Sequence, residues 1–201
     1  FMKVRQNDMR DSTYDRLSGL YEKHCGYIST NALLGEGFSN RQIAAFVQEQ
    51  YLEKICHGYY WLLRTGRKKP SDHKCIEVCL SDPRAVICLD SALYYQDIIK
   101  QEPPALCVAT ERTDRSIIKT NFPVERHYFS ESSFGVGQRE IRTDYGSYRI
   151  FDVERTICDA MRLGRGLEVE IHYEDHKSRS YDRLMKYAEL LRVKIPGGKV
   201  R

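Results

Sequence analysis

Two histidines and two carboxylates have the types and spacing that could support chemistry. His172 and His176 stand four residues apart, which places both imidazoles on one helix face, as a zinc pair requires. The sequence there is not HExxH, and the spacing indicates no third ligand, so a solvated charged helix face is the preferred interpretation. Glu154 and Asp159 could hold Mg²⁺ only with further oxygen ligands from another element. An Asp152 helix cap and an ion pair from Arg155 to Asp159 explain these residues without catalysis.

Other chemical motifs are weak or missing from the sequence. Cys75 and Cys79 also lie four residues apart, but in an apolar helix pattern that favours core packing. No GxSxG or P-loop pattern occurs, and Gly135 to Gly137 indicate only a loop. We therefore expect no catalytic residues, no metal site and no cofactor, and a protein that is not an enzyme.

The residues from 40 to 48 have the pattern of a DNA-reading helix. Ser39 is a good N-cap, and Ile43, Phe46 and Val47 form one apolar stripe. The other face is polar or small, as insertion into the major groove requires. The residues predicted to read bases are Ser39, Asn40, Arg41, Gln42, Ala45 and Gln48.

Positive charge concentrates directly after this helix. The whole chain has a formal net charge of +4, and residues 50–70 hold five Lys or Arg against one Glu. Such local charge beside a recognition helix predicts contacts with DNA phosphates, although a solvated linker is the simpler alternative. The residues predicted to bind phosphate are Lys54, His57, Tyr59, Arg64, Arg67, Lys68 and Lys69.

The elements needed to position these residues follow from the pattern of residues 12–63. A helix from Ser12 to about Cys25 is closed by Gly26, and a short strand, a small helix and a turn precede the helix at residues 40–48. A β-hairpin follows, turning at His57 and Gly58. This order predicts a winged helix-turn-helix.

The remaining sequence predicts a mixed α+β domain. Residues 64–71 have linker composition, so we expect a winged helix-turn-helix domain over residues 1–66 and a larger domain over residues 72–201. Predicted strands lie near residues 85–89, 105–109, 124–129, 140–143 and 148–151. Predicted helices lie near residues 72–80, 90–98, 153–163, 167–177 and 181–193.

Composition bears on the location of the protein. No run approaches the ~18 apolar residues of a membrane span, and the first ten residues lack the apolar centre of a signal peptide. Seven cysteines without a CxxC motif favour reduced thiols. We expect a cytoplasmic protein without a membrane partner.

Several segments together resemble the AbiE-type antitoxins. The resemblance covers about residues 12–193 and is carried by GYISTNALL, FSNRQIAAFVQEQYLEKICHGYYWL, DPRAVICLDSALYY, FDVERTICDAMR and DRLMKYAELLRV. These proteins are the repressor halves of type IV toxin–antitoxin, or abortive-infection, systems in phage defence. The segment from Phe151 to Arg162 is the most specific part, because winged helices occur in very many regulators.

The resemblance implies a repressor and antitoxin. The N-terminal domain would bind inverted repeats in double-stranded DNA upstream of its own operon. The C-terminal domain would counter a nucleotidyltransferase-like toxin, with which it need not form a stable complex. The polar segment of residues 167–180 and the terminal PGGKVR depart from the family pattern. The alternatives are a winged-helix-targeted nuclease or phosphotransferase, and an orphan regulator or adaptor without a toxin.

Overall fold

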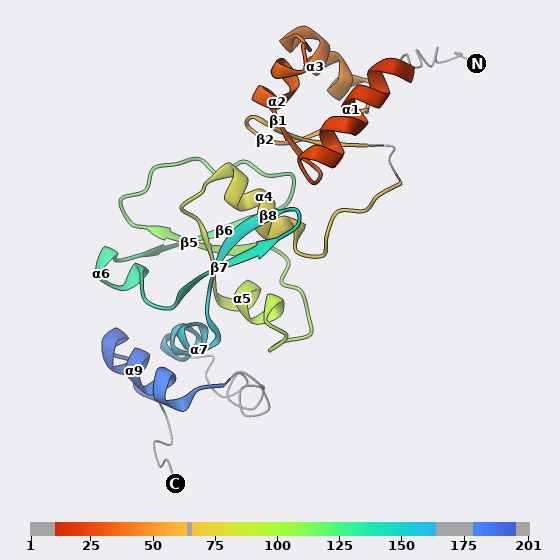
Figure 1. Ribbon diagram of the computed structural model, residues 1–201. Coiled ribbons are helices and arrows are strands. Elements are labelled where there is room, and N and C mark those ends of the chain that lie inside the picture. Colours follow the sequence, from red (N-terminus) through yellow and green to blue (C-terminus); the bar gives the residue numbers. More distant parts are fainter. Residues whose placement is uncertain (1–10, 64–65, 164–178, 196–201) are drawn as a thin grey trace, which may run out of the picture. The chain divides into compact units, whose positions relative to one another are not determined.

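The computed structural model describes residues 11–63, 66–163 and 179–195 of the chain. Two compact units divide the chain, and we describe each by itself. Unit 1 contains the residues up to Pro70 together with Asp144–Gly146, and unit 2 contains Ser71–Thr143 with the residues from Ser147 onward. The structure is mixed α+β, with one β-sheet in each unit (Figure 1).

Unit 1 contains three helices and a small antiparallel sheet. The helices are α1 (Asp11–Lys23), α2 (Thr30–Gly35) and α3 (Asn40–Gln48), and the strands are β1 (Tyr27–Ser29), β2 (Leu52–Cys56) and β3 (Tyr59–Leu62). The strand order is β1-β3-β2, with β3 antiparallel to both neighbours. The helix order and the hairpin therefore match the pattern predicted from residues 12–63.

The hairpin of unit 1 departs from simple alternation. Lys54 faces Tyr60 and Cys56 faces Tyr59, so the register shifts around Ile55. This bulge lets Ile55 and Cys56 both be buried, whereas regular alternation along a strand would place them on opposite sides. Lys54 remains exposed beside the turn.

Unit 2 is built on a five-stranded mixed sheet. Its strand order is β6-β5-β4-β8-β7, with β5 parallel to β6, β4 antiparallel to β5, and β4 parallel to β8. The strands are β4 (Val86–Ile87), β5 (Leu106–Glu111), β6 (Val124–Phe129), β7 (Gln138–Thr143) and β8 (Gly146–Phe151). Each predicted strand is present, and β6 has the predicted limits.

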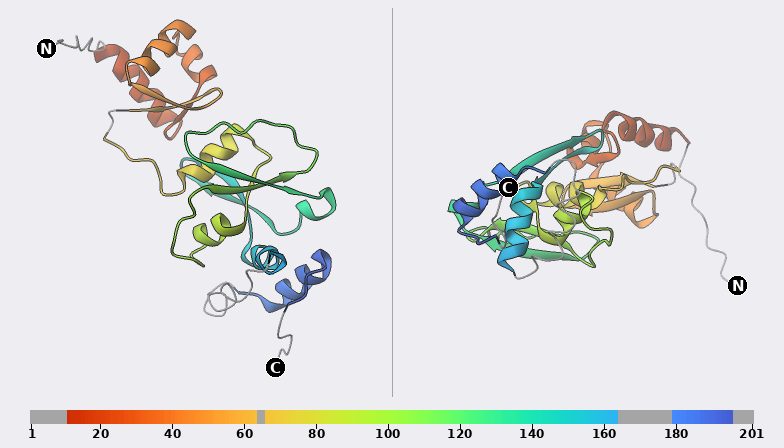
Figure 2. Two further views of the ribbon diagram at one scale, coloured as in Figure 1. Left: turned by 180° about the vertical axis from the view of Figure 1, so that it is seen from behind. Right: turned by 90° about the horizontal axis from the view of Figure 1, so that it is seen from below.

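Helices cover both faces of this sheet. They are α4 (His73–Ser81), α5 (Leu89–Tyr95), α6 (Glu131–Phe134), α7 (Val153–Arg162) and α9 (Tyr181–Leu191). Figures 1 and 2 show α4 on one side of the sheet, with α5 and α7 on the other. A core cluster joins Leu93 of α5, Ile157 of α7 and Leu184 of α9. No local pattern in the sequence predicts α6, which is a single turn.

Some predicted features lie outside the described residues. They are the helix at residues 167–177 with His172 and His176, the cation Arg64, the first ten residues and the end from residue 196. No helix in the described ranges is long and apolar enough to cross a lipid bilayer.

Candidate nucleic-acid interface

The start of α3 is fixed by a reciprocal cap. Ser39 Oγ accepts a hydrogen bond from the Gln42 amide, and Gln42 Oε1 accepts one from the Ser39 amide at 2.9 Å. The sequence predicted Ser39 as the cap, and the capping box adds Gln42 to it. Both side chains were also predicted to read bases, but Ser39 Oγ and Gln42 Oε1 already accept hydrogen bonds within the cap.

The two faces of α3 differ sharply in burial. Ile43 and Phe46 are 3% and 7% exposed and pack into unit 1. Asn40, Arg41 and Gln48 are exposed, whereas Ala45 is half-buried. The face that offers hydrogen-bonding groups outward therefore consists of Asn40, Arg41 and Gln48, with the remaining amide of Gln42.

A polar hollow lies next to this face, entirely within unit 1. Its volume is about 490 Å³, and it brings Asn40 of α3 together with Lys54 and Tyr59 of the hairpin. The complete lining is Ser29, Thr30, Asn31, Asn40, Lys54, His57, Gly58, Tyr59 and Tyr60. The structure thus gathers one predicted base-reading residue and three predicted phosphate contacts in one place. Sequence analysis did not identify Ser29, Thr30, Asn31 or Tyr60, because no local pattern shows that the start of α2 borders the hairpin.

The predicted phosphate contacts after the hairpin have different surroundings. Arg67 forms an ion pair with Glu22 at 2.7 Å, and Lys69 forms one with Glu53 at 2.9 Å. Lys68 is exposed. Ion pairs at the surface contribute about 0–1 kcal/mol, so a phosphate can replace Glu22 beside the exposed Arg67 at little cost, whereas the pair of Lys69 with Glu53 is partly buried.

The carboxylates of α7 lie in buried ion pairs. Glu154 is 1% exposed and accepts hydrogen bonds from the Ser180 amide at 2.8 Å and from Arg183 at 3.3 Å. Asp159 is also 1% exposed and binds Arg155 Nε at 2.8 Å. Burial raises the pKa of Asp159, although Arg155 lowers it. The predicted Asp152 cap and the predicted pair of Arg155 with Asp159 are both present.

The side chain of Arg155 binds the backbone of the loop at Gly135–Gly137. It is fully buried, and Nη1 donates to the carbonyl oxygens of Ser133 and Val136 at 2.6 and 2.7 Å. Its guanidinium lies 4.3 Å from the ring centroid of Phe151. A Cβ on Gly137 would come within 2.5 Å of Arg155 Cβ, so this glycine permits the close approach.

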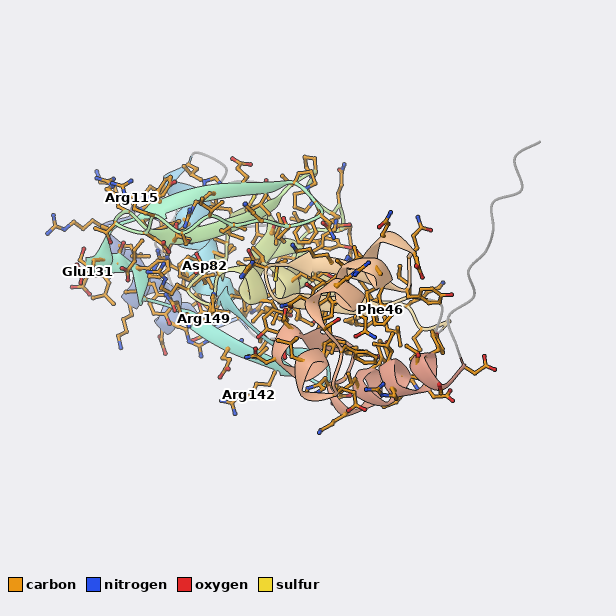
Figure 3. All side chains as sticks on the ribbon, turned by 90° about the horizontal axis from the view of Figure 1, so that it is seen from above. Phe46, Asp82, Arg115, Glu131, Arg142 and Arg149 are labelled. Atoms are coloured by element: carbon orange, nitrogen blue, oxygen red, sulfur yellow. The ribbon has the colours of Figure 1, made fainter. Side chains whose placement is uncertain are left out.

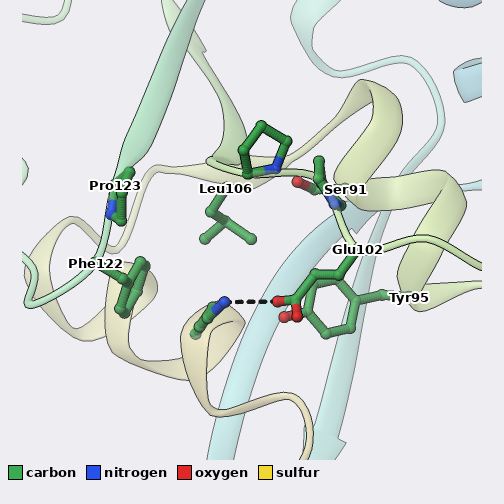
Figure 4. Close-up of a pocket in the computed structure, with 9 residues that line it drawn as sticks. Ser91, Tyr95, Glu102, Leu106, Phe122 and Pro123 are labelled. Carbon is green, nitrogen blue, oxygen red and sulfur yellow. Dashed lines mark hydrogen bonds and ion pairs between the residues drawn. The ribbon is translucent and has the colours of Figure 1, made fainter.

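A small hollow lies near the ends of α4 and α5 in unit 2 (Figure 4). Lys74 and Glu102 form an ion pair at 2.6 Å beside it, and Pro103, Phe122 and Pro123 line it. Its volume is about 10 Å³. This is room for about one water molecule, so the hollow does not suit an organic ligand.

Three potential metal ligands meet on β5 and β6, which sequence analysis did not predict. Cys107, Glu125 and His127 place one ligand atom each within 4.8 Å of the others. Glu125 and His127 are two residues apart on β6, so their side chains point to the same face of the sheet. Cys107 of β5 is the partner of Glu125 in the parallel ladder. The only sequence signal was the E-x-H spacing. It could not reveal the site, because the pairing of β5 with β6 is a tertiary contact.

Comparisons with known proteins show a likeness in fold to solved structures. No protein-family model matches the chain, and no curated protein matches it. A solved structure described as the crystal structure of the RV2827C protein from Mycobacterium tuberculosis matches with a TM-score of 0.64 and 13% sequence identity. The match covers 90% of this chain and 73% of that chain. The likeness shows the fold alone.

Proposed function

We propose that this protein is a DNA-binding transcriptional repressor and antitoxin of a type IV toxin–antitoxin system. In this proposal unit 1 is a winged helix-turn-helix, α3 reads bases in the major groove, and the hairpin of β2 and β3 is the wing. The observation that carries the DNA-binding half is the exposed face of α3, with Asn40 bordering the same hollow as Lys54 and His57.

The chemistry of these groups suits double-stranded DNA. Arg41 can donate two hydrogen bonds to guanine N7 and O6, and Asn40 or Gln48 can pair with adenine. Each good pair contributes about 1–3 kcal/mol of discrimination between bases. Lys54, His57, Tyr59 and Lys68 would bind phosphates, and these contacts would orient the protein without reading sequence.

The antitoxin half rests on the resemblance to the AbiE-type family. Unit 2 would supply this activity against a nucleotidyltransferase-like toxin. We propose no catalytic role for Glu154 and Asp159, because both buried carboxylates are already paired. Asp159 pairs with Arg155 within α7, and Glu154 pairs with Arg183 of α9. Co-expression with the product of an adjacent nucleotidyltransferase-like gene tests this half, and restored growth is the expected result.

A gel-shift experiment tests the DNA-binding half. The full chain is titrated against the DNA upstream of its own gene, with unrelated competitor DNA at two salt concentrations. The test variant is Arg41→Ala with Gln48→Ala, which leaves the capping box of Ser39 and Gln42 intact. The matched control is Arg142→Ala, because Arg142 is an exposed arginine of unit 2 whose side chain is 81% exposed (Figure 3).

The expected result is binding that survives competitor in the wild type and in the control. The double variant should bind all DNA equally weakly, because it has lost base contacts worth about 1–3 kcal/mol each. Lys68→Ala should weaken every sequence alike and lower the salt slope by about 1. If unrelated competitor DNA abolishes binding by the wild type, base reading by α3 is rejected.

A further inference from the structure

We propose that Cys107, Glu125 and His127 form a Zn²⁺ site on the sheet of unit 2. The site goes beyond the proposed function, since it uses none of the residues of unit 1. Its ligands would be the thiolate of Cys107, a carboxylate oxygen of Glu125 and Nε2 of His127. A fourth position would remain for water.

The backbone brings the three side chains to one face of the sheet. Cys107 and Glu125 are directly paired in the parallel ladder of β5 and β6, so their side chains point the same way. His127 follows Glu125 by two residues and therefore projects on the same face. Phe129, two residues after His127, packs with Cys107 in one core cluster. This shared packing confirms that these alternate residues of β6 and Cys107 point to the same face of the sheet.

The spacing of the histidine nitrogen and the glutamate oxygen suits a tetrahedral zinc ion. His127 Nε2 lies 3.4 Å from Glu125 Oε1, and all three ligand atoms lie within 4.8 Å of one another. Zinc bonds of about 2.0–2.3 Å at tetrahedral angles place their ligand atoms roughly 3.3–3.8 Å apart. The nitrogen and oxygen are therefore already separated as two zinc ligands would be.

His127 presents an unsatisfied nitrogen to this space. Its Nε2 is buried and has no hydrogen-bond partner among the described residues, despite the nearby Glu125. A buried polar atom without a partner is unfavourable, and coordination of a metal would remove this penalty. This atom is the observation that distinguishes the cluster from ordinary surface residues.

The surroundings permit both metal access and charge balance. The side chain of Glu125 is 61% exposed, whereas Cys107 is 6% exposed, so an ion can reach the buried thiol from the solvent side. The guanidinium carbon of Arg155 lies 5.4 Å from the ring centroid of Phe129. Its positive charge is paired, however, because Arg155 Nε lies 2.8 Å from Asp159 Oδ2. A thiolate and a carboxylate would neutralise the two charges of the ion.

The ligand set indicates zinc rather than calcium or magnesium. Calcium and magnesium take oxygen ligands, whereas a thiolate with an imidazole suits zinc and related transition metals. Three protein ligands with one open position are typical of accessible zinc sites rather than closed structural ones. The site would join the edge strand β6 to its neighbour β5.

Cobalt titration of the full, reduced chain tests this proposal. Co²⁺ substitutes for Zn²⁺ and gives visible bands typical of tetrahedral sites, and a thiolate ligand adds a charge-transfer band. We expect one Co²⁺ per chain with both features, and its displacement by Zn²⁺. Cys107→Ser should remove the charge-transfer band, and His127→Gln should remove the tetrahedral spectrum. Each variant should also lower Zn²⁺ affinity by at least about 100-fold, because losing only an outer-shell partner costs about 10–100-fold.

Two controls and one further ligand variant keep the result interpretable. Cys75→Ser replaces another buried cysteine and should leave the spectrum unchanged. Glu125→Gln removes the proposed carboxylate ligand from an exposed side chain, so it should weaken Zn²⁺ binding and change the Co²⁺ spectrum even if the Cys107 variant fails to fold. The double change His172→Gln, His176→Gln tests the histidine pair outside the described residues and should also leave the spectrum unchanged. A spectrum that survives Cys107→Ser or His127→Gln in folded protein, or no Co²⁺ binding by the wild type, would overturn the proposal.

Discussion

Arg155 is the residue whose surroundings explain most of the organisation of unit 2. It is 0% exposed, and it joins Asp159 to the backbone of the loop after α6. Its Nη2 has no hydrogen-bond partner among the described residues. A buried guanidinium is stable only when it is paired and hydrogen-bonded, so the loop and Asp159 depend on one another through Arg155.

Replacing Arg155 should destabilise unit 2 strongly. Arg155→Ala leaves Asp159 buried without its main partner, for which we expect a loss of about 3–5 kcal/mol in the free energy of unfolding. Urea denaturation followed by far-UV circular dichroism measures this loss. The control is Arg142→Ala, which removes only an exposed ion pair with Glu140 and should leave the urea midpoint nearly unchanged. Equal effects of the two substitutions would contradict the role assigned to Arg155.

The surroundings of Asp114 predict how the stability of the protein depends on pH. Burial alone would raise the pKa of Asp114, but the amide and hydroxyl of Ser116, with Arg84 and Arg126, bring that pKa below its usual value. The folded pKa is therefore lower than the unfolded pKa of about 3.9. The ionised group stabilises the protein above about pH 4, and this contribution is lost as the pH falls through the folded pKa.

Asp114→Asn should accordingly cost stability at neutral pH and progressively less in acid. The Ser116 amide bonds Asp114 Oδ1 at 2.7 Å, and Arg84 reaches the same oxygen at 2.7 Å, so the ionised form is the one recognised. Urea midpoints of wild type and variant, measured from neutral pH to about pH 2, should converge below about pH 4. A constant difference across this range would show that the carboxylate does not titrate as described.

At the scale of elements, α1 and β1 meet at a glycine that the fold of unit 1 requires. Gly26 follows α1 with a φ of 102°, and its amide donates to the Tyr21 carbonyl at 2.9 Å. A Cβ there would lie 2.3 Å from the Trp61 ring. The chain can therefore leave α1 and enter β1 only with glycine at this position.

Two glycine substitutions should have opposite effects on unit 1. Gly26→Ala combines a left-handed backbone with a steric overlap, so we expect a loss of more than about 1 kcal/mol. Gly19 lies within α1 with open space around it, and Gly19→Ala should gain about 0.5–1 kcal/mol from helix propensity. Denaturation followed by tryptophan fluorescence measures both, because Trp61 is the only tryptophan and lies in unit 1. A gain in stability from Gly26→Ala would contradict the described turn.

At the scale of the whole molecule, each unit has its own buried core. Leu17, Ile28 and Trp61 are buried in unit 1, and separate clusters form around Phe151 and Ile157 in unit 2. Units with separate cores can unfold in separate transitions.

We therefore expect unit-specific effects of substitutions. Gly26→Ala should lower the midpoint seen by Trp61 fluorescence, while Arg155→Ala should lower a second transition seen by far-UV circular dichroism. The Trp61 midpoint of the Arg155 variant should remain close to that of the wild type. Coincident shifts of both signals in both variants would show instead that the chain unfolds as one cooperative unit.

The sequence by itself determined the elements whose signals are local. Ser39 with the stripe of Ile43 and Phe46 set the limits of α3, and Asp152 set the start of α7. Caps and periodic burial depend on residues within one or two turns, so they can be recognised in the chain. The α+β class and the order of helices and strands in unit 1 followed from the same signals.

The tertiary structure alone decided the arrangements that depend on distant residues. The bulge at Ile55, the loop around Arg155 and the meeting of Cys107 with His127 all arise from contacts across strands or between elements. Strand order in a mixed sheet is set by packing of whole elements and by crossover connections, which no local pattern encodes. The single turn of α6 was missed because its residues carry no periodic apolar stripe, and only Phe134 is buried in the core.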